Sequence, residues 1–372
     1  MELKNLGFRF LLFLVSWTLL APCRTDASSM PRRLMAEDPS LDLVVAPAAT
    51  NIPTADPSLE LVVGPAATNI PTITEAIATA VQMRTDDKRF VIKIKPGVYH
   101  ENIIIDERLP NLTLLGDGKE TTIITGELSV GGDNLSTFDT APVAVEADGF
   151  IARGITFRNT AGLEGGQAAA LRVSGDKAAF YSCSFEGYQD TLYVHSGRQF
   201  YKKCDVYGTV DFIFGNAMAV FQDCHIYVRA PKGNQAVITA SKREGPDEQT
   251  GIVIQKSHVS AAPGENLEGI QVYLGRPWGH YARTVVMESK IDSLIDPEGW
   301  LWWKGKEDIY KDKIYYAEYE NTGPGSSMVD RVDWSSARQV ITPQEAEQFS
   351  VENFIDGNSW LPDTNVPFTS DL

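Results

Sequence analysis

The sequence predicts an all-β fold, a parallel β-helix wound by a single chain, from a six-residue pattern that recurs in its middle. Five windows open and close with a large apolar residue and carry Cys or Ser in fourth place: FYSCSF, YKKCDV, FQDCHI, IQKSHV and VMESKI, starting at residues 180, 201, 221, 254 and 286. Short strands that return at such intervals are typical of a solenoid, in which each coil buries its apolar face only against its neighbours. The two longer intervals, of 33 and 32 residues, predict coils with projecting loops, a usual place for a binding site.

An antiparallel sandwich of many short strands is the alternative all-β architecture. A sandwich of this kind depends on tight hairpins, and the Asn-Gly and Asp-Gly signals for them are sparse in this sequence, as at Asp117-Gly118 and Asp356-Gly357. The solenoid is therefore the favoured interpretation.

The N-terminus has the three parts of a secretory signal peptide. Lys4 and Arg9 form a basic region, Phe10 to Leu20 form an apolar run, and small residues follow near Ala27. A signal anchor is the alternative, but the apolar run is short and is interrupted by hydroxyl residues. We expect residues 1–28 to be removed and the mature protein to be secreted.

A segment after this signal is duplicated in tandem, because Asp38–Thr54 recurs almost unchanged as Asp56–Thr72. Only the second copy runs directly into a helix signal. We therefore expect residues 29–58 to be a duplicated linker and residues 59–372 to be one domain, with the second copy supplying its first strand.

The helix signal predicts a cap for the N-terminal end of the solenoid. Thr72 and Glu75 have the spacing of a capping box, and Ile73, Ile77 and Val81 recur on one helical face. Because the end coil of a solenoid has no neighbour on one side, a helix that covers it with an apolar face stabilises the stack.

Strand-like segments follow this helix, and the repeated windows then continue to about residue 291. The segments are Phe90–Ile94, Leu112–Leu115, Thr122–Ile124, Val143–Val145 and Ile155–Phe157. Near the C-terminus, the sequence Thr-Pro-Gln-Glu at residues 342–345 combines a cap with proline at the first helical position, which predicts short helices there. We expect these helices to pack along the side of the stack.

The charge of the chain limits its partners. The formal net charge is −16, which argues against nucleic acid and anionic membranes as partners and against strong adsorption to a polyanionic matrix. After the N-terminal signal, no stretch of the sequence is long and apolar enough to cross a membrane.

Three cysteines lie outside the signal, and all three occupy the same place in successive coils: Cys183, Cys204 and Cys224. An odd number leaves at least one thiol unpaired within the chain. We favour a disulfide between the first two over simple packing of small side chains. Zinc is not expected, since clustered His or further Cys residues are missing. Asn111 and Asn134 begin triplets of the type that accepts N-linked glycans.

Two aspartates are the strongest candidates for chemistry. Asp190 and Asp211 are 21 residues apart, and each stands seven residues after a cysteine of the repeated pattern. Since a coil here has about this length, we expect the two carboxylates to be stacked at the strand spacing of about 4.8 Å. At that separation their titrations split, so that one group can act as an acid while the other acts as a nucleophile.

Further polar and aromatic residues are expected near these carboxylates. Gln167 and Gln189 stand about one coil apart, and their amides are suitable donors for a developing oxyanion. Arg276 could hold one carboxylate ionised through a forked hydrogen bond, and Trp278 and Trp300 offer flat faces for sugar rings. Each of these residues could also have a purely structural role. An aspartate can form a turn, the two glutamines can form a ladder along the solenoid, Arg276 can pair with a surface acid, and a tryptophan can belong to the core. The combination favours a site, because independent spacings converge on one patch.

The chain resembles the plant pectinesterases, or pectin methylesterases, over its length from about residue 73 onward. The segments that carry the resemblance are Gly97–Glu101 (GVYHE), Phe157–Gly162 (FRNTAG), Gln167–Leu171 (QAAAL), Tyr188–Tyr193 (YQDTLY), Asp211–Gly215 (DFIFG), Tyr273–Trp278 (YLGRPW), Gly299-Trp300 with Trp303, and Trp360–Pro362 (WLP). Several of these motifs are long and specific.

The resemblance implies a right-handed parallel β-helix that hydrolyses methyl esters of galacturonate in pectin and releases methanol. It implies that Asp211 is the nucleophile and that Asp190 is the general acid, then the base that activates water. It implies that Gln167 and Gln189 stabilise the oxyanion and that Arg276 orients Asp211. Spacing alone does not say which aspartate attacks.

The resemblance also implies the remaining partners of the site. Tyr193, Phe214, Trp278 and Trp300 would line the sugar groove. No metal or organic cofactor is expected. The implied substrate is methyl-esterified homogalacturonan of the extracellular cell wall, and the implied state is a monomer.

The sequence departs from the family pattern in three respects. Gly64–Asn69 replaces the acidic-glycine turn that usually precedes the first helix, which puts the geometry of the first coil in doubt. Ala169 stands where the family often has Val. A long inhibitor-like region before the catalytic domain is missing, so a separate inhibitor protein becomes the candidate regulator.

Three other functions are compatible with such a scaffold. A pectate lyase would need a calcium-binding acid cluster with an arginine base, and a polygalacturonase would need three clustered aspartates with a histidine. The sequence offers neither pattern in recognisable form. A non-catalytic wall protein that binds pectin is the third possibility, and the complete set of candidate catalytic residues argues against it.

Overall fold

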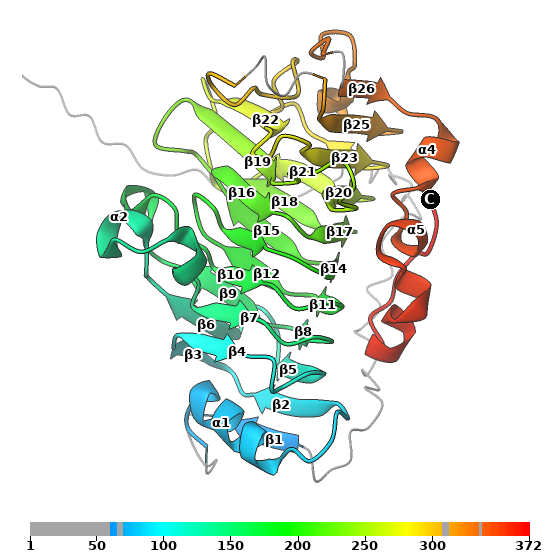
Figure 1. The fold of residues 1–372 in the computed structure, drawn as a ribbon. Coiled ribbons are helices and arrows are strands. Elements are labelled where there is room, and N and C mark those ends of the chain that lie inside the picture. Colours follow the sequence, from blue (N-terminus) through cyan, green and yellow to red (C-terminus); the bar gives the residue numbers. More distant parts are fainter. Residues whose placement is uncertain (1–59, 65–69, 307–311, 335–336) are drawn as a thin grey trace, which may run out of the picture. The chain divides into compact units, whose positions relative to one another are not determined.

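The structure, a computed structural model, describes residues 60–64, 70–306, 312–334 and 337–372. The chain winds into a right-handed parallel β-helix with three parallel sheets, so the expected fold class is confirmed (Figure 1). The expected signal peptide and the expected linker, residues 1–58, lie outside the described residues. Most of the unusual turn, residues 65–69, lies outside them as well.

Each of the central coils contributes one strand to each of three sheets, named here A, B and C, whereas the coils at the two ends of the described stack contribute fewer. Within the described residues, sheet A consists of β1 (Glu60–Val63), β2 (Phe90–Ile94), β5 (Leu112–Gly116), β8 (Ile151–Arg153), β11 (Ala178–Tyr181), β14 (Arg198–Lys202), β17 (Met218–Gln222), β20 (Gly251–Gln255), β23 (Arg283–Met287), β25 (Tyr315–Tyr319) and β26 (Ala337–Val340). The strands β1 and β2 pair in parallel, so the second copy of the duplicated segment supplies the first strand of the described residues, as the sequence predicts.

The other two sheets complete the coils. Sheet B consists of β3 (Gly97–His100), β6 (Thr122–Gly126), β9 (Thr156–Asn159), β12 (Ser184–Glu186), β15 (Asp205–Gly208), β18 (His225–Val228), β21 (His258–Ala261) and β24 (Lys290–Ile291). Sheet C consists of β4 (Ile103–Ile105), β7 (Val143–Val145), β10 (Leu171–Val173), β13 (Leu192–Val194), β16 (Val210–Gly215), β19 (Gln235–Ser241) and β22 (Gln271–Gly275). Figure 1 shows the strands of successive coils stacked in this order.

The core between the sheets is built from columns of like side chains. The rings of Phe180, Tyr201 and Phe221 stack in successive coils with centroid distances of 4.8 and 4.4 Å. All three are fully buried. Offset-stacked rings at this separation are favourable, so the aromatic first position of the windows stabilises the register of neighbouring coils.

The repeated windows are corners between sheets A and B rather than single strands. In each window the first two residues end a strand of sheet A, and the last two begin a strand of sheet B. The third residue has a left-handed backbone with φ of 50–55°, in Ser182, Lys203, Asp223, Lys256 and Glu288. This conformation costs a non-glycine residue about 1–2 kcal/mol. The cost recurs in each of the five windows because the corner must turn the chain within two residues.

The expected disulfide is wrong, since Cys183, Cys204 and Cys224 are free and buried thiols. The Cys204 thiol donates to the carbonyl oxygens of Phe180 (3.6 Å) and Lys202 (3.4 Å), one in the preceding coil and one in its own. The serines that replace cysteine in later coils make the same pair of contacts. The fourth position of the window thus holds a small buried side chain that donates hydrogen bonds to the carbonyl oxygens of the corner. Cysteine and serine can both do this.

The helix α1 (Ile73–Met83) covers the N-terminal coil as predicted, but its cap differs from the expected capping box. The Thr72 side chain accepts from the amide of Glu75 at 3.1 Å. The return contact is absent among the described residues; instead Glu101, from the next turn of the solenoid, accepts from the amides of Ile73 (2.9 Å) and Thr74 (2.8 Å). A carboxylate from elsewhere in the fold thus satisfies free amides at the helix start.

Two of the expected strands have the predicted bounds, Phe90–Ile94 and Val143–Val145. The strands predicted from Leu112 and Thr122 extend one and two residues further. The strand expected over Ile155–Phe157 is shifted to Thr156–Asn159, because Gly154 with a φ of 61° still belongs to the corner before it.

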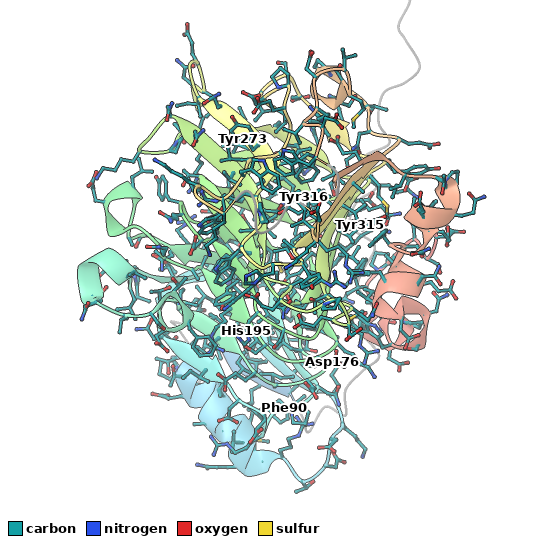
Figure 2. The ribbon with its side chains drawn as sticks, turned by 45° about the horizontal axis from the view of Figure 1, so that its top comes forward. Phe90, Asp176, His195, Tyr273, Tyr315 and Tyr316 are labelled. Carbon is teal, nitrogen blue, oxygen red and sulfur yellow. The ribbon has the colours of Figure 1, made fainter. Side chains whose placement is uncertain are left out.

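The C-terminal helices α4 (Pro343–Glu347) and α5 (Val351–Ile355) pack on the outer face of sheet A, as predicted. Tyr315 and Tyr316 are neighbours in β25 and lie on opposite faces of sheet A (both are labelled in Figure 2). Tyr316 is fully buried in the core inside the coils, whereas the ring of Tyr315 lies 5.3 Å from that of Phe349 beside the helices. The helices of the described residues are all too short or too polar to span a lipid bilayer.

Candidate active site

A cavity of about 420 Å³ opens on the outer face of sheet C. Its wall includes every candidate residue of the sequence analysis except Trp300, together with Ser136, Thr137, Phe138, Ala240, Lys242 and Trp303. These residues come from successive coils, so the stacking of the solenoid assembles the site from segments that lie far apart in the sequence.

The two aspartates lie one above the other, as their spacing predicts. In the strands that follow them, Leu192 pairs with Ile213 and Tyr193 with Phe214, which is the same offset of 21 residues. The amide of Asp190 donates to the carbonyl oxygen just before Asp211, that of Val210, at 3.0 Å. The exposed fractions are 9% for Asp190 and 5% for Asp211, so both carboxyl groups are largely withdrawn from water.

Both aspartates have a left-handed backbone, with φ of 62° for Asp190 and 51° for Asp211. Asp211 also lies in a β-bulge, because three steps along β16 from Val210 to Ile213 match only two steps along β19. Aspartate tolerates this conformation better than most residues, and bulges re-aim side chains next to functional sites. Asp190 and Asp211 are therefore turn residues and, at the same time, members of the cavity wall.

Arg276 makes a forked ion pair with Asp211. Its Nε donates to Oδ1 at 2.8 Å and its Nη2 donates to Oδ2 at 2.6 Å, so both carboxylate oxygens are occupied. Arg276 directly follows β22, in the second coil after Asp211. Its guanidinium lies 4.3 Å from the ring centre of Trp303, which holds the arginine from the other side.

The environments of the two carboxyl groups differ in a way that separates their protonation states. Burial, reinforced by the neighbouring charge of Asp211, raises the pKa of Asp190 well above its ordinary value. Burial also raises the pKa of Asp211, but the hydrogen bonds and charge of Arg276 oppose that rise. Asp211 is consequently the group that ionises first, and Asp190 is the group that loses its proton at higher pH.

The two glutamines lie in neighbouring coils beside the aspartates. Gln167 and Gln189 form an isolated parallel bridge, and the carbonyl oxygen of Gln189 accepts from the amide of Ala168 at 3.1 Å. Both side chains line the cavity and are half-buried. Their amide groups can therefore reach a substrate atom held in front of the carboxyl pair.

Aromatic rings form the rest of the wall. Tyr193 and Phe214 stack with a centroid distance of 4.3 Å, and Trp278 lies tilted at 5.9 Å from Phe214. Phe138, which the sequence analysis missed, adds its edge to Tyr193 at 6.4 Å. It arrives on a short 3-10 turn, Thr137–Asp139, in a loop without the coil periodicity, so no repeat signal marked it.

The expected role of Trp300 in the groove is wrong. Its exposed fraction is 3%, and its ring lies 4.6 Å from that of Tyr316 in the core. Trp303 takes the expected place at the cavity, three residues further on. The motif contains both tryptophans, and only the path of the chain after Gly299, where φ is 72°, decides which one faces the cavity.

Substitutions at these two tryptophans should separate their roles. Trp303→Ala should lower kcat/KM about fivefold to tenfold, because it removes an aromatic face of the cavity and a contact to Arg276. Trp300→Ala should instead lower the free energy of unfolding by about 3–5 kcal/mol, since it leaves a cavity in the core. Denaturant unfolding and steady-state kinetics on both variants test this assignment, and an exchanged pattern would contradict it.

The described residues hold no cluster of His, Cys, Asp or Glu suited to a metal ion. The cavity wall contains two acids, two amides, one arginine engaged with an acid, and one lysine, and the acids and amides are a set for acid–base and nucleophilic chemistry.

Comparison with known proteins identifies the family. A family model described as Pectinesterase matches residues 60–358. The chain belongs to the pectinesterase family. Pectinesterase 2 of Citrus sinensis is 53% identical over 304 residues, which cover 81% of this chain and 58% of that protein. A relative from Arabidopsis thaliana, named "Probable pectinesterase/pectinesterase inhibitor 17", is 53% identical over 300 residues, which cover 80% of this chain and 58% of the relative.

Solved structures of the pectinesterase family share the fold. A pectin methylesterase from carrot is 45% identical with a TM-score of 0.80, and the match covers 86% of this chain and 99% of that one. A pectin methylesterase solved in complex with a hexasaccharide is 26% identical with a TM-score of 0.64, covering 84% of this chain and 98% of that one. The chain thus spans nearly all of these solved proteins, but only about three fifths of the length of the two curated relatives.

Proposed function

We propose that this chain hydrolyses methyl esters of galacturonate units in pectin and releases methanol. The observation that carries the proposal is the pair of stacked, buried aspartates in unlike environments, Asp211 held by the forked ion pair with Arg276 and Asp190 beside it with a pKa raised by burial and by the charge of Asp211. Membership of the pectinesterase family and the names of the similar proteins support the same reaction.

In the first half of the proposed reaction, a carboxylate oxygen of Asp211 attacks the ester carbonyl carbon. The bond to the methoxy oxygen breaks, and Asp190 transfers its proton to that oxygen, so methanol leaves and an acyl–aspartate anhydride remains. The raised pKa of Asp190 suits this step, because the leaving group needs a proton donor that is still protonated near the working pH.

In the second half, Asp190 acts in the reverse direction. Its carboxylate takes a proton from water, and the oxygen of that water attacks the anhydride carbonyl carbon. The bond to Asp211 breaks, which releases a galacturonate carboxylic acid and restores both aspartates to their starting states. Each turnover consumes one ester and one water and yields one acid and one methanol, and no redox step or cofactor is involved.

The glutamines and the aromatic rings supply the remaining functions. Gln167 and Gln189 would donate amide hydrogens to the oxyanion that forms in both tetrahedral intermediates. Tyr193, Phe214 and Trp278 would bind the sugar rings through their flat faces, and Trp303 would contribute in the place expected for Trp300. The solved relative with a hexasaccharide supports an oligosaccharide as the ligand of this groove.

We also propose where the protein acts and what regulates it. The N-terminal signal in the sequence and the cell-wall location of pectin support secretion to the extracellular wall. Relatives named as pectinesterase/pectinesterase inhibitor support a proteinaceous inhibitor as a partner. The working form is proposed to be a monomer that modifies the wall.

A methanol-release assay on highly methyl-esterified pectin tests the proposed function. Purified protein should release methanol in proportion to the carboxyl groups formed, without new reducing ends and without unsaturated uronides. Unsaturated products would indicate a lyase, and new reducing ends would indicate a glycosidase. Binding of pectin with no methanol released would instead support a non-catalytic wall protein.

A further inference from the structure

The tryptophan next to Trp303 in the sequence has an aromatic partner outside the cavity. The ring of Trp302 stacks on that of Trp334 with a centroid distance of 3.6 Å and an angle of 21° between the ring planes. Neither of these two side chains lines the cavity, whereas Trp303 does. The stack therefore lies one residue away from the ring that contacts the guanidinium of Arg276 at 4.3 Å.

The backbone that carries Trp303 is held by the sheet ladder only on its N-terminal side. Trp300 forms an isolated bridge with Gly275, and the amide of Leu301 donates to the carbonyl oxygen of Gly275 at 3.0 Å. From Leu301 to Lys306 the chain forms no helix or strand. Among the described residues, the backbone of Trp302 makes no hydrogen bond to another backbone group. The packing of the Trp302 ring, rather than the ladder, therefore fixes this part of the chain.

Trp334 is itself held by a buried ion pair. Arg331, three residues before it, donates through Nε and Nη2 to the two carboxylate oxygens of Glu318 in β25, at 2.7 and 3.2 Å. The exposed fractions are 6% for Arg331 and 2% for Glu318. The Nη1 of Arg331 also donates to the carbonyl oxygen of Pro297 at 3.1 Å. Because a forked pair fixes geometry as well as charge, Trp334 meets its partner ring from a well-defined segment.

We propose that Trp334 is a positioning residue for the reaction, which acts through Trp302 on the place of Trp303. Held in that place, the ring of Trp303 packs against the guanidinium of Arg276, which stays bonded to both carboxylate oxygens of Asp211. This inference rests on the proposed function and adds to it a residue that touches no reacting atom.

The consequence concerns the pH at which the nucleophile becomes ionised. The hydrogen bonds and charge of Arg276 oppose the rise in the pKa of Asp211 that burial causes. An arginine without a ring packed against it has more side-chain freedom, so its two hydrogen bonds are less fully made and the pKa of Asp211 rises. A change in the stack leaves in place the other ionisable side chains of the cavity wall, which are Asp190, Tyr193 and Lys242.

The test follows the decline of kcat/KM for methanol release at low pH, because this decline reports the ionisation of Asp211 in the free enzyme. In Trp334→Leu the decline should move to higher pH by about 0.3–1 unit, the scale of one aromatic pair, while kcat/KM at its maximum stays within about twofold of the wild type. Trp302→Leu should cause the same shift. Trp334→Phe keeps a flat ring and should restore most of the wild-type profile.

Trp360→Leu is the matched control for the loss of a packed tryptophan. Trp360 is 5% exposed, packs in the cluster between sheet A and the C-terminal helices, and donates through Nε1 to the carbonyl oxygen of Ile355 at 3.0 Å. This control should lower the melting temperature without moving the decline at low pH. A route through Trp303 also predicts that Trp334→Leu adds no further shift when Trp303→Ala is already present.

A low-pH decline in Trp334→Leu and Trp302→Leu that coincides with that of the wild type, with a melting temperature lowered as in the control, would overturn the inference. Fully additive shifts in the double variant with Trp303→Ala would overturn it as well. Trp302→Leu carries the same test if Trp334→Leu does not fold.

Crystal structures of the variants provide a readout that needs no turnover. In Trp334→Leu or Trp302→Leu the ring of Trp303 should leave the guanidinium of Arg276, whereas an unmoved Trp303 and an intact forked pair with Asp211 would refute the positioning role. A wild type that releases no methanol would instead refute the proposed function, and these structures would still decide the role of Trp334.

Discussion

Asp211→Asn should lower kcat for methanol release by about four orders of magnitude or more, the largest effect expected in this protein. An amide has no anionic oxygen to attack the ester carbonyl, and the other carboxyl group of the cavity wall, Asp190, has no arginine bonded to it as Asp211 has. Turnover is measured by methanol release on pectin, with enough enzyme to detect the residual rate.

The fold should survive this substitution. Asparagine tolerates the left-handed backbone found at Asp211, where φ is 51°, about as well as aspartate does. The loss of the forked pair with Arg276 should lower the melting temperature by a few degrees. Asp292→Asn, on the exposed edge of sheet B, is the matched control for removal of one surface carboxylate. Near-normal turnover in Asp211→Asn would remove this residue as nucleophile.

Asp190→Asn should lower kcat by about 10²–10⁴-fold, because the departing methoxy group loses its proton donor and the attacking water loses its base. The pH profile provides the sharper readout. In the wild type, kcat/KM should fall at low pH as Asp211 becomes protonated and fall at high pH as Asp190 ionises. The high-pH decline should disappear in Asp190→Asn. A variant that keeps this decline would show that another group supplies the proton.

The same residue should change how stability depends on pH. Burial raises the pKa of Asp190 in the folded chain above its value in the unfolded chain. Between those two values the folded chain binds more protons, so the free energy of unfolding falls as pH rises through this window. Asparagine does not titrate, and the variant should therefore resist heating better than the wild type toward the upper end of the window. Parallel melting curves over pH for the two proteins would contradict the raised pKa.

The stacking of the aspartates could be predicted from the sequence, whereas their individual roles could not. Their spacing of 21 residues equals one coil, and the ladder of Leu192 with Ile213 maintains that offset. The difference in pKa depends on Arg276, which arrives from the second coil after Asp211. No local pattern relates residues 211 and 276, because loops of unequal length lie between them.

The errors of the sequence analysis occur where side-chain orientation or a corner decides the outcome. A small residue at the fourth window position predicts burial for Cys204, but burial is compatible with a disulfide and with the thiol donor that is found. Trp300 and Trp303 differ by three residues, and either could face the groove until the chain path after Gly299 is known. Phe138 and Lys242 carry no repeat signal at all.

The sequence by itself therefore determined the solenoid, its register and the alignment of the two acids. In a parallel stack each coil is hydrogen-bonded to the next, so a spacing along the chain becomes a position in space. Only the folded arrangement shows that the three thiols lie unpaired in the core and that Trp303, rather than Trp300, lines the cavity. The reason is that loops and corners follow the packing of their surroundings, and that packing appears only when all coils are in place.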